Sequence, residues 1–150
     1  MKIKNLTLII ISLIFAGCGN GGDKVVDTQK NILTQNSWYN SNSCDNSSKI
    51  YTFDNVNINI NSYQDEEFNI SDTNYSYNII NYTDGGVDIK IGEKEYSCLT
   101  SYESPNTTNI HMQCVNINDD SDMEYIFTIW NSKNLAIQNK ESDCQIINTL

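Results

Sequence analysis

Short runs in which apolar and polar residues alternate, separated by turn residues, recur along most of this chain and restrict the folds open to it. The clearest run covers residues 49–60, KIYTFDNVNINI. If the chain turns at Asp54 and Asn55, the apolar side chains share one face; they are Tyr51, Phe53, Val56, Ile58 and Ile60. A period of two is typical of strands that bury one face and expose the other. We therefore predict two half-buried strands here.

The same alternation continues toward the middle of the chain. Residues 66–77 are expected to form a second strand pair that turns at residues 71–74. The strongest hairpin signal is the dipeptide at positions 84 and 85, Asp-Gly, which favours a tight turn between two strands. A turn at this position places Tyr82 opposite Val87 and Ile80 opposite Ile89 in the predicted hairpin.

The inward face changes parity twice, between Ile79 and Ile80 and between Cys114 and Val115. An extra residue in one strand produces such a change, so we expect a β-bulge at both places. Residues 131–140 fit either a final strand or a short helix capped by Asn131 or Ser132.

All these segments are consecutive and are joined by short turns, and no pattern typical of alternating strands and helices is present. The sequence therefore predicts an all-β fold, an antiparallel up-and-down meander that closes into a small barrel of about eight to ten strands. A β-sandwich is the alternative. A barrel of about eight strands is either filled by side chains or holds one small ligand.

The N-terminal segment has the features of an export signal. Lys2 and Lys4 precede an apolar run at residues 6–15, which is too short for a transmembrane helix but suits a signal peptide. The run ends in Phe-Ala-Gly-Cys, and this segment resembles the signal of bacterial lipoproteins. The resemblance implies removal of residues 1–17 and lipidation of Cys18 as the new N-terminus. An ordinary cleaved signal with an unmodified cysteine is the alternative.

The resemblance also divides the chain and locates it. Residues 18–31 would be the lipidated cysteine with a flexible tether and a brief helical turn, and residues 32–150 the barrel domain. Gly19 directly follows the lipidated cysteine. By the same resemblance, this residue implies a lipid anchor in the cell outer membrane, on the periplasmic or the surface face of that membrane. An anchor in the cell membrane is the alternative.

The start of the barrel domain has a second resemblance. Residues 32–39, ILTQNSWY, followed by a β-meander, are similar to the opening of lipocalin-like bacterial lipoprotein domains. The resemblance implies that Trp38 lies on the first strand and plugs the closed end of a lipocalin-like barrel.

Four cysteines remain beyond Cys18, and an exported protein meets conditions in which disulfides persist. A hairpin of residues 95–102 and 109–115, centred on Asn106, places Cys98 opposite Cys114 at a distance that a disulfide can bridge. We predict that pair, which leaves Cys44 to pair with Cys144; four cysteines allow three connectivities in all.

Charge and motif content narrow the function. The nine basic residues are all lysines against 19 acidic residues, a net charge of −10, which argues against nucleic acid as a partner. Asp119, Asp120 and Asp122 are weak candidates for a calcium site, and a solvated turn is the favoured interpretation. His111 is expected on the outward face opposite Ser101, without a catalytic motif. No catalytic residue, metal or cofactor is predicted.

Two functions remain. The first is a lipid-anchored envelope protein whose barrel binds a small apolar ligand. The second is an interaction or inhibitor protein that binds a cationic protein through its acidic surface, with the general plan of membrane-bound lysozyme inhibitors. A hydrolase ranks last.

Overall fold

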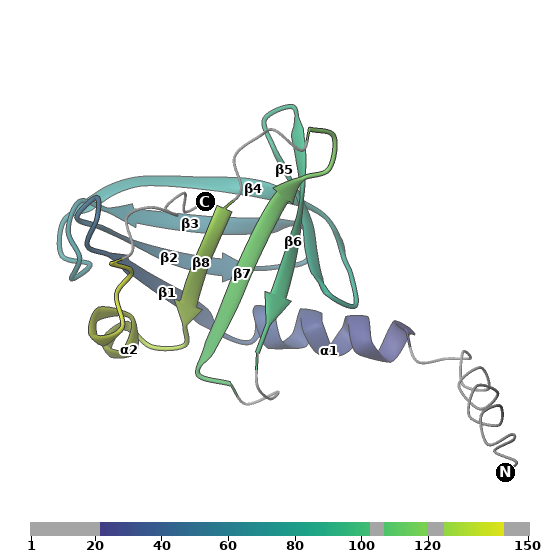
Figure 1. Cartoon of the computed structure of the whole chain (residues 1–150), viewed down its shortest axis with the longest axis horizontal. Helices are drawn as coiled ribbons and strands as arrows, with labels where there is room; N and C mark the ends of the chain where they lie inside the picture. The colour runs from purple at the N-terminus through teal and green to yellow at the C-terminus, as the bar shows by residue number, and fades with distance from the viewer. Residues whose placement is uncertain (1–21, 103–106, 120–124, 143–150) are drawn as a thin grey trace, which may run out of the picture.

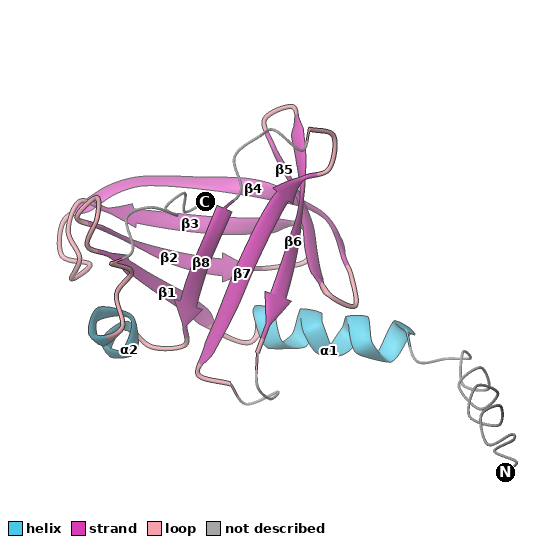
Figure 2. Ribbon diagram, viewed as in Figure 1, coloured by secondary structure: helices cyan, strands magenta, loops and turns pink. Residues whose placement is uncertain are grey.

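The fold is an eight-stranded barrel with two helices in the part of the chain that the structure describes. A computed structural model describes residues 22–102, 107–119 and 125–142 (Figures 1 and 2). The elements follow in the order α1 (Gly22–Thr34), β1 (Ser37–Asn42), β2 (Ser47–Phe53), β3 (Asn57–Tyr63), β4 (Ser71–Tyr82), β5 (Gly86–Ile91), β6 (Lys94–Ser101), β7 (Asn109–Asn116), β8 (Tyr125–Trp130) and α2 (Lys133–Gln138).

Each strand pairs antiparallel with the next one along the chain, and β1 pairs with β8 through Tyr39 and Trp130. This last pair closes the sheet, so the predicted barrel is confirmed and the sandwich alternative is wrong. The ambiguous segment at residues 131–140 forms α2, where the Ser132 hydroxyl accepts a hydrogen bond from the Leu135 amide at 3.3 Å and caps the helix.

Helix α1 gives the barrel two different ends. It contacts β2, β4 and β5 and buries Ile32 and Leu33 against the core, where the prediction placed a tether with only a brief helical turn. We call this the closed end; the turns β2–β3, β4–β5 and β6–β7 lie there. The opposite end, at the connections β1–β2, β3–β4, β5–β6 and β7–β8, we call the open end. Among the described helices, none is long and apolar enough to span a membrane.

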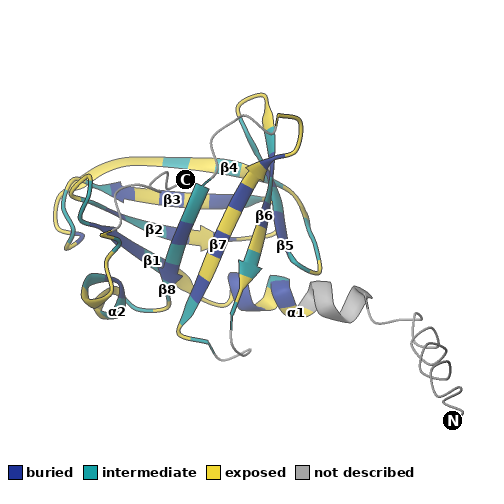
Figure 3. Ribbon diagram, in the orientation of Figure 1, coloured by how far each residue is buried: buried dark blue, intermediate teal, exposed yellow. Residues whose placement is uncertain are grey.

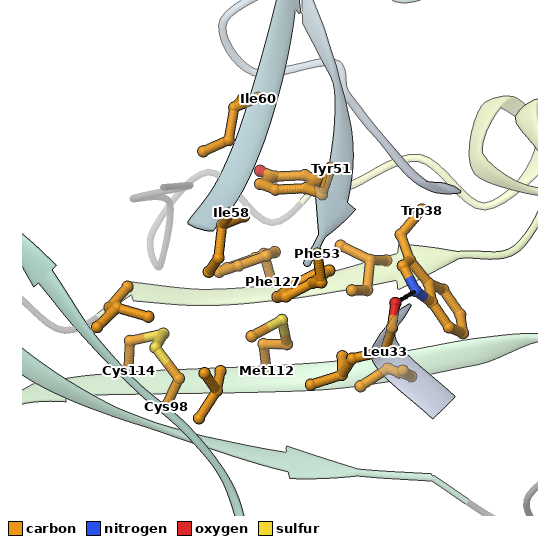
Figure 4. Packing of buried hydrophobic residues seen from close by; sticks show 14 of the residues in the cluster. Leu33, Trp38, Tyr51, Phe53, Ile58, Ile60, Cys98, Met112, Cys114 and Phe127 are labelled. Carbon is orange, nitrogen blue, oxygen red and sulfur yellow. Dashed lines mark hydrogen bonds between the residues drawn. A yellow bond between two sulfur atoms is a disulfide. The ribbon is translucent and has the colours of Figure 1, made fainter. Parts of the chain in front are cut away.

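The period-two prediction holds along the strands. Residues of β7 alternate between buried and exposed, which Figure 3 shows as bands. Inward side chains from the strands form one buried cluster with the end of α1 (Figure 4). Its largest fully buried members include Trp38, Tyr51 and Phe127, and the last two rings stack with their centroids 5.5 Å apart.

Two predictions are wrong: the strand pair at residues 66–77, and the inward side chain of Val56 after the first turn. In both places an aspartate side chain accepts hydrogen bonds from backbone amides and holds the chain in a turn. Asp65 accepts hydrogen bonds from the backbone amides of Glu67, Asn69 and Ile70, so residues 64–70 form a loop and the strand begins at Ser71. Asp54 accepts hydrogen bonds from the amides of Val56 and Asn57, both at 2.7 Å. Val56 is therefore held in the turn and is 60% exposed instead of facing the core.

One of the two predicted bulges is present. The register shifts between Ile79 and Asn81, so the Tyr82–Val87 pair is confirmed, but Ile79 rather than Ile80 pairs with Ile89. Strand β7 has no such shift: it continues regularly through Asn116, which is buried, while Val115 is exposed. The prediction of a bulge after Cys114 is therefore wrong.

Candidate functional site

The closed end of the barrel is sealed by packing and one hydrogen bond. The Trp38 indole N–H donates to the Leu33 backbone carbonyl at 2.9 Å, which joins the end of α1 to the first residues of β1 (Figure 4). Trp38 is 1% exposed. Gln29 of α1 is also buried there. Helix α1 and the core side chains therefore cover and fill this end of the barrel.

The predicted disulfide between Cys98 and Cys114 is confirmed. The two residues are directly opposite in the β6–β7 register, and both are buried in the core. Cys44 is disulfide-bonded as well, while Cys144 lies outside the described residues, so the Cys44–Cys144 pairing stays a prediction. Cys18 also lies outside them.

A lysine projects into the barrel near its open end. Lys49 is in phase with the inward residues Tyr51 and Phe53 on β2, and it pairs with Asn40 on β1 and Ser62 on β3. Burial lowers the pKa of Lys49 to about 8, an effect that the Asp45 carboxylate only partly offsets. Burying an ammonium group is unfavourable unless its charge is compensated by a partner.

Two buried asparagines of β1, Asn40 and Asn42, face the same side of the sheet as Lys49 on the neighbouring strand β2. The Asn40 side-chain amide donates to the Thr128 carbonyl at 2.9 Å. Asn42 is fully buried and its side-chain oxygen accepts from the Cys44 amide at 2.8 Å, but its Nδ2 has no hydrogen-bond partner. A buried donor without a partner is costly and therefore rare in folded proteins.

Tyrosines form the rest of this region. The rings of Tyr75 and Tyr77 lie 5.5 Å apart on β4. The rings of Tyr96 on β6 and Tyr125 on β8 lie 5.4 Å apart, across the intervening strand β7. Burial, and then the neighbouring Tyr77 phenol, raise the pKa of Tyr75 to about 12. Tyr51 is more deeply buried, and its pKa is raised well above the usual value by burial and by the nearby phenols of Tyr75 and Tyr77. We call Tyr51, Tyr75, Tyr77, Tyr96 and Tyr125 the tyrosine cluster.

Sequence reasoning found part of this cluster. The sequence offers six tyrosines as candidates to line a polar-aromatic cavity, with core packing as the favoured interpretation; they are Tyr63, Tyr75, Tyr77, Tyr82, Tyr96 and Tyr102. Three of them, Tyr75, Tyr77 and Tyr96, belong to the cluster. Tyr63 instead packs against Phe68 outside the barrel, and the Tyr82 hydroxyl donates to the Asp54 carbonyl at the closed end. Lys49 was not singled out, although its spacing from Tyr51 and Phe53 already indicates an inward side chain.

The remaining candidates do not assemble into a site within the described residues. His111 pairs with Ser101 in the register, as expected, and its Nδ1 lies 3.3 Å from the Thr128 hydroxyl. The described residues contain no group of three or more potential metal ligands. Asp119 is described, whereas Asp120 and Asp122 lie outside the described residues.

A surface hollow of about 320 Å³ lies over the loop between β3 and β4 and is lined mainly by polar and acidic residues, Asn46, Asp65, Glu66, Glu67, Asn69 and Ile70. Two of its carboxylates are already engaged. Asp65 binds the backbone amides of its own loop, and Glu66 forms an ion pair with Lys140. The acidic groups of the hollow thus serve mainly to fix the loop against the barrel.

The lowered pKa of Lys49 predicts a specific dependence of stability on pH. Between pH 8 and pH 10.5 the unfolded chain carries a proton on this lysine that the folded chain has lost, so stability rises with pH in that window. We expect Lys49→Met to raise the free energy of unfolding at pH 7 by about 1–3 kcal/mol and to remove the rise. Urea denaturation from pH 7 to 9.5 measures both effects.

Lys90 on β5 is the matched control, because its side chain is on the outer face of the barrel. Lys90→Met should change stability by less than about 0.5 kcal/mol at every pH. A Lys49→Met variant that keeps the wild-type pH dependence would contradict the placement of Lys49.

Comparison with protein-family models, with curated proteins and with solved structures finds no match to this chain.

Proposed function

We propose that this chain is a lipid-anchored envelope lipoprotein, held by acylated Cys18 in the outer membrane, whose lipocalin-like barrel binds a small molecule with an apolar body. The observation that carries the proposal is the state of the inward side chains toward the open end. Tyr75, Tyr77, Ile91 and Tyr125 pack against the core, yet each remains partly exposed. The inward side chains therefore leave apolar and aromatic surface partly exposed at the edge of the core.

The position of the ligand follows from where the interior is already filled. Toward the closed end, Trp38, Phe53, Ile110 and Met112 are buried and occupy the space between the strands. A ligand would accordingly rest on the tyrosine cluster. Aromatic walls with a few polar groups are typical of small-molecule sites.

The mass of the mature chain tests whether Cys18 carries the lipid anchor. We expect the mature chain from membranes to begin at an acylated Cys18, because anchoring by several acyl chains is stable whereas one chain alone is marginal. Cys18→Ser should abolish the acyl mass and move the protein out of the membrane fraction. An unmodified Cys18 in membrane-derived protein would contradict the proposal.

The ligand site is tested by blocking the open end. Protein purified from membranes, then denatured, should release a small molecule detectable by mass spectrometry. Ile91→Trp adds bulk among the tyrosines and should abolish the release, whereas Leu99→Trp, at an outward position that is 55% exposed, should not. Equal release from both variants would place the molecule elsewhere.

The alternative function is binding of a cationic protein, as in lysozyme inhibitors. Its support is charge alone: without residues 1–17 the chain has seven lysines against 19 acidic residues, a net charge of −12. Such a field accelerates association with basic proteins and is screened by salt. Salt-sensitive lysozyme inhibition at micromolar protein, unchanged in Ile91→Trp, would favour this function over the first.

A further inference from the structure

We propose that the first half of β4 is a docking edge, to which a positively charged segment of a partner protein adds as an extended strand. The inference goes beyond the small-molecule function and does not depend on it. It gives the alternative function, binding of a cationic protein, a defined surface. Its basis is that β4 has a neighbouring strand on one side only along half of its length.

The pairing of β4 shows where this edge lies. On one side, β3 pairs with β4 from Ser71 to Asn78. On the other side, β5 pairs with β4 only from Asn78 onward, because β5 ends at Ile91 and the chain then turns into β6. Within the described part of the chain, residues 71–77 therefore have a strand on one side alone. In Figure 1 this half of β4 runs across the view, away from the β5–β6 hairpin.

The main-chain groups of two residues point to the unpaired side. Alternate residues of an antiparallel strand direct their N–H and C=O groups to opposite neighbours. The Ile79 amide donates to the carbonyl of Val56, just before β3, at 2.7 Å, so the odd-numbered residues here face β3 and the even-numbered ones face away. Asn74 and Ser76 thus present two N–H and two C=O groups on the unpaired side, and both residues are exposed. An extended segment can form main-chain hydrogen bonds with them.

The sequence of the edge does not oppose strand addition. Natural sheets protect their edges with lysine, proline or irregular strands. Residues 71–77, SDTNYSY, contain neither lysine nor proline. The register with β3 shifts before Asn74, but from Asn74 to Asn78 the ladder is regular. This regular stretch is the part that an added strand would use.

The side chains beside the edge favour apolar residues on one face of the added strand. Tyr75 and Tyr77 point inward, pack against the core and remain partly exposed, with their rings 5.5 Å apart. Alternate side chains of an added strand would lie beside these rings, because neighbouring strands share the same two faces. Apolar side chains at these positions would extend the core.

Charge favours basic residues on the other face. Asp72 is the charged residue of the edge and is exposed, and the chain as a whole has 19 acidic residues against nine lysines. A field of this sign attracts a basic segment and opposes the pairing of two copies of the chain through the same edge. The partner that fits is therefore an extended segment in which basic and apolar residues alternate.

The experiment compares two peptides of identical sequence and charge, Lys-Val-Lys-Val-Lys-Val with blocked ends. In one peptide the three valine amides are N-methylated, and in the other the three lysine amides. With valine facing the tyrosines, the lysine amides face Asn74 and Ser76, because directly opposite residues share a face. We expect the valine-methylated peptide to bind about tenfold more tightly. Fluorescence anisotropy with the full chain, purified from membranes in mild detergent, measures both affinities.

A proline variant and its control locate the edge. Ser76→Pro removes one main-chain donor on the unpaired side and leaves the ladder to β3 intact, since an edge strand tolerates proline where its N–H is unpaired. It should weaken the valine-methylated peptide by about fivefold or more. Ser76→Ala keeps the N–H and should bind this peptide as the wild type does. Circular dichroism checks that both variants are folded, and the comparison of the two peptides needs neither of them.

The outcomes separate this edge from attraction by charge alone. Equal binding of the two peptides, or binding that survives Ser76→Pro in folded protein, would overturn the edge and leave only electrostatic attraction to basic partners. Binding of neither peptide would overturn it as well. If neither peptide binds and sedimentation shows a dimer that Ser76→Pro dissociates, the edge belongs to a second copy of the chain. Release of a small molecule on denaturation is independent of all these results.

Discussion

Replacing Trp38 with alanine is expected to lower the free energy of unfolding by about 3–5 kcal/mol, enough to unfold much of a marginally stable domain. The side chain is 1% exposed, its ring lies in the core at the closed end, and its N–H donates to the Leu33 carbonyl near the end of α1. The substitution leaves a cavity and frees α1 from the barrel. Urea denaturation, monitored by far-ultraviolet circular dichroism, measures the loss.

A second variant of Trp38 separates the contribution of the aromatic ring from that of its hydrogen bond, and a variant of Trp130 serves as the control. Trp38→Phe keeps most of the ring and removes the donor to Leu33, and should cost about 1–2 kcal/mol. Trp130→Ala is the matched tryptophan control, because Trp130 lies on the outward side of β8 and is only partly buried; its loss should be clearly smaller. If Trp38→Ala lowers the free energy of unfolding by less than about 1 kcal/mol, this residue does not seal the barrel.

Removal of the Cys98–Cys114 disulfide is expected to cost about 3 kcal/mol in the double variant Cys98→Ala, Cys114→Ala. The bond closes a loop with a sequence separation of 16 and joins two strands at the centre of the core. Its loss gives the unfolded chain more conformational freedom and removes two buried sulfur atoms. The same denaturation measurement tests this value.

The control uses the neighbouring pair on the same strands. Leu99 and Gln113 are directly opposite on the outward face, and Leu99→Ala with Gln113→Ala should cost less than about 1 kcal/mol. If the two double variants lose equal stability, the effect comes from disturbing β6 and β7 in general and not from the disulfide.

Much of the barrel was predictable from local pattern. The hairpin between β6 and β7, with Cys98 opposite Cys114, follows from period-two alternation and one turn centre. The errors arose where a side chain competes with the strand for backbone amides. Asp65 draws residues 64–70 into a loop and Asp54 holds Val56 in a turn, and alternation of apolar residues contains no information about either bond.

The candidate site was less predictable because it depends on closure of the sheet. The inward direction of Lys49 follows from its phase with Tyr51, but β2 and β8 meet only across the barrel interior, as the stacking of Tyr51 on Phe127 shows. The unpartnered Nδ2 of Asn42 is likewise a property of packing: the sequence shows an asparagine, whereas the fold shows that its oxygen is used and its nitrogen is not.

A titration of the Lys49 side chain by NMR tests the central claim, that a lysine extends into the partly enclosed open end of the barrel. Chain labelled with ¹⁵N at lysine Nζ, with Lys49→Met to assign the signal, would be followed from pH 6 to 11. The structure predicts a midpoint near pH 8, because burial disfavours the charged amine. A midpoint near 10.5, the value of a solvated lysine, would contradict the placement and with it the site built on this residue.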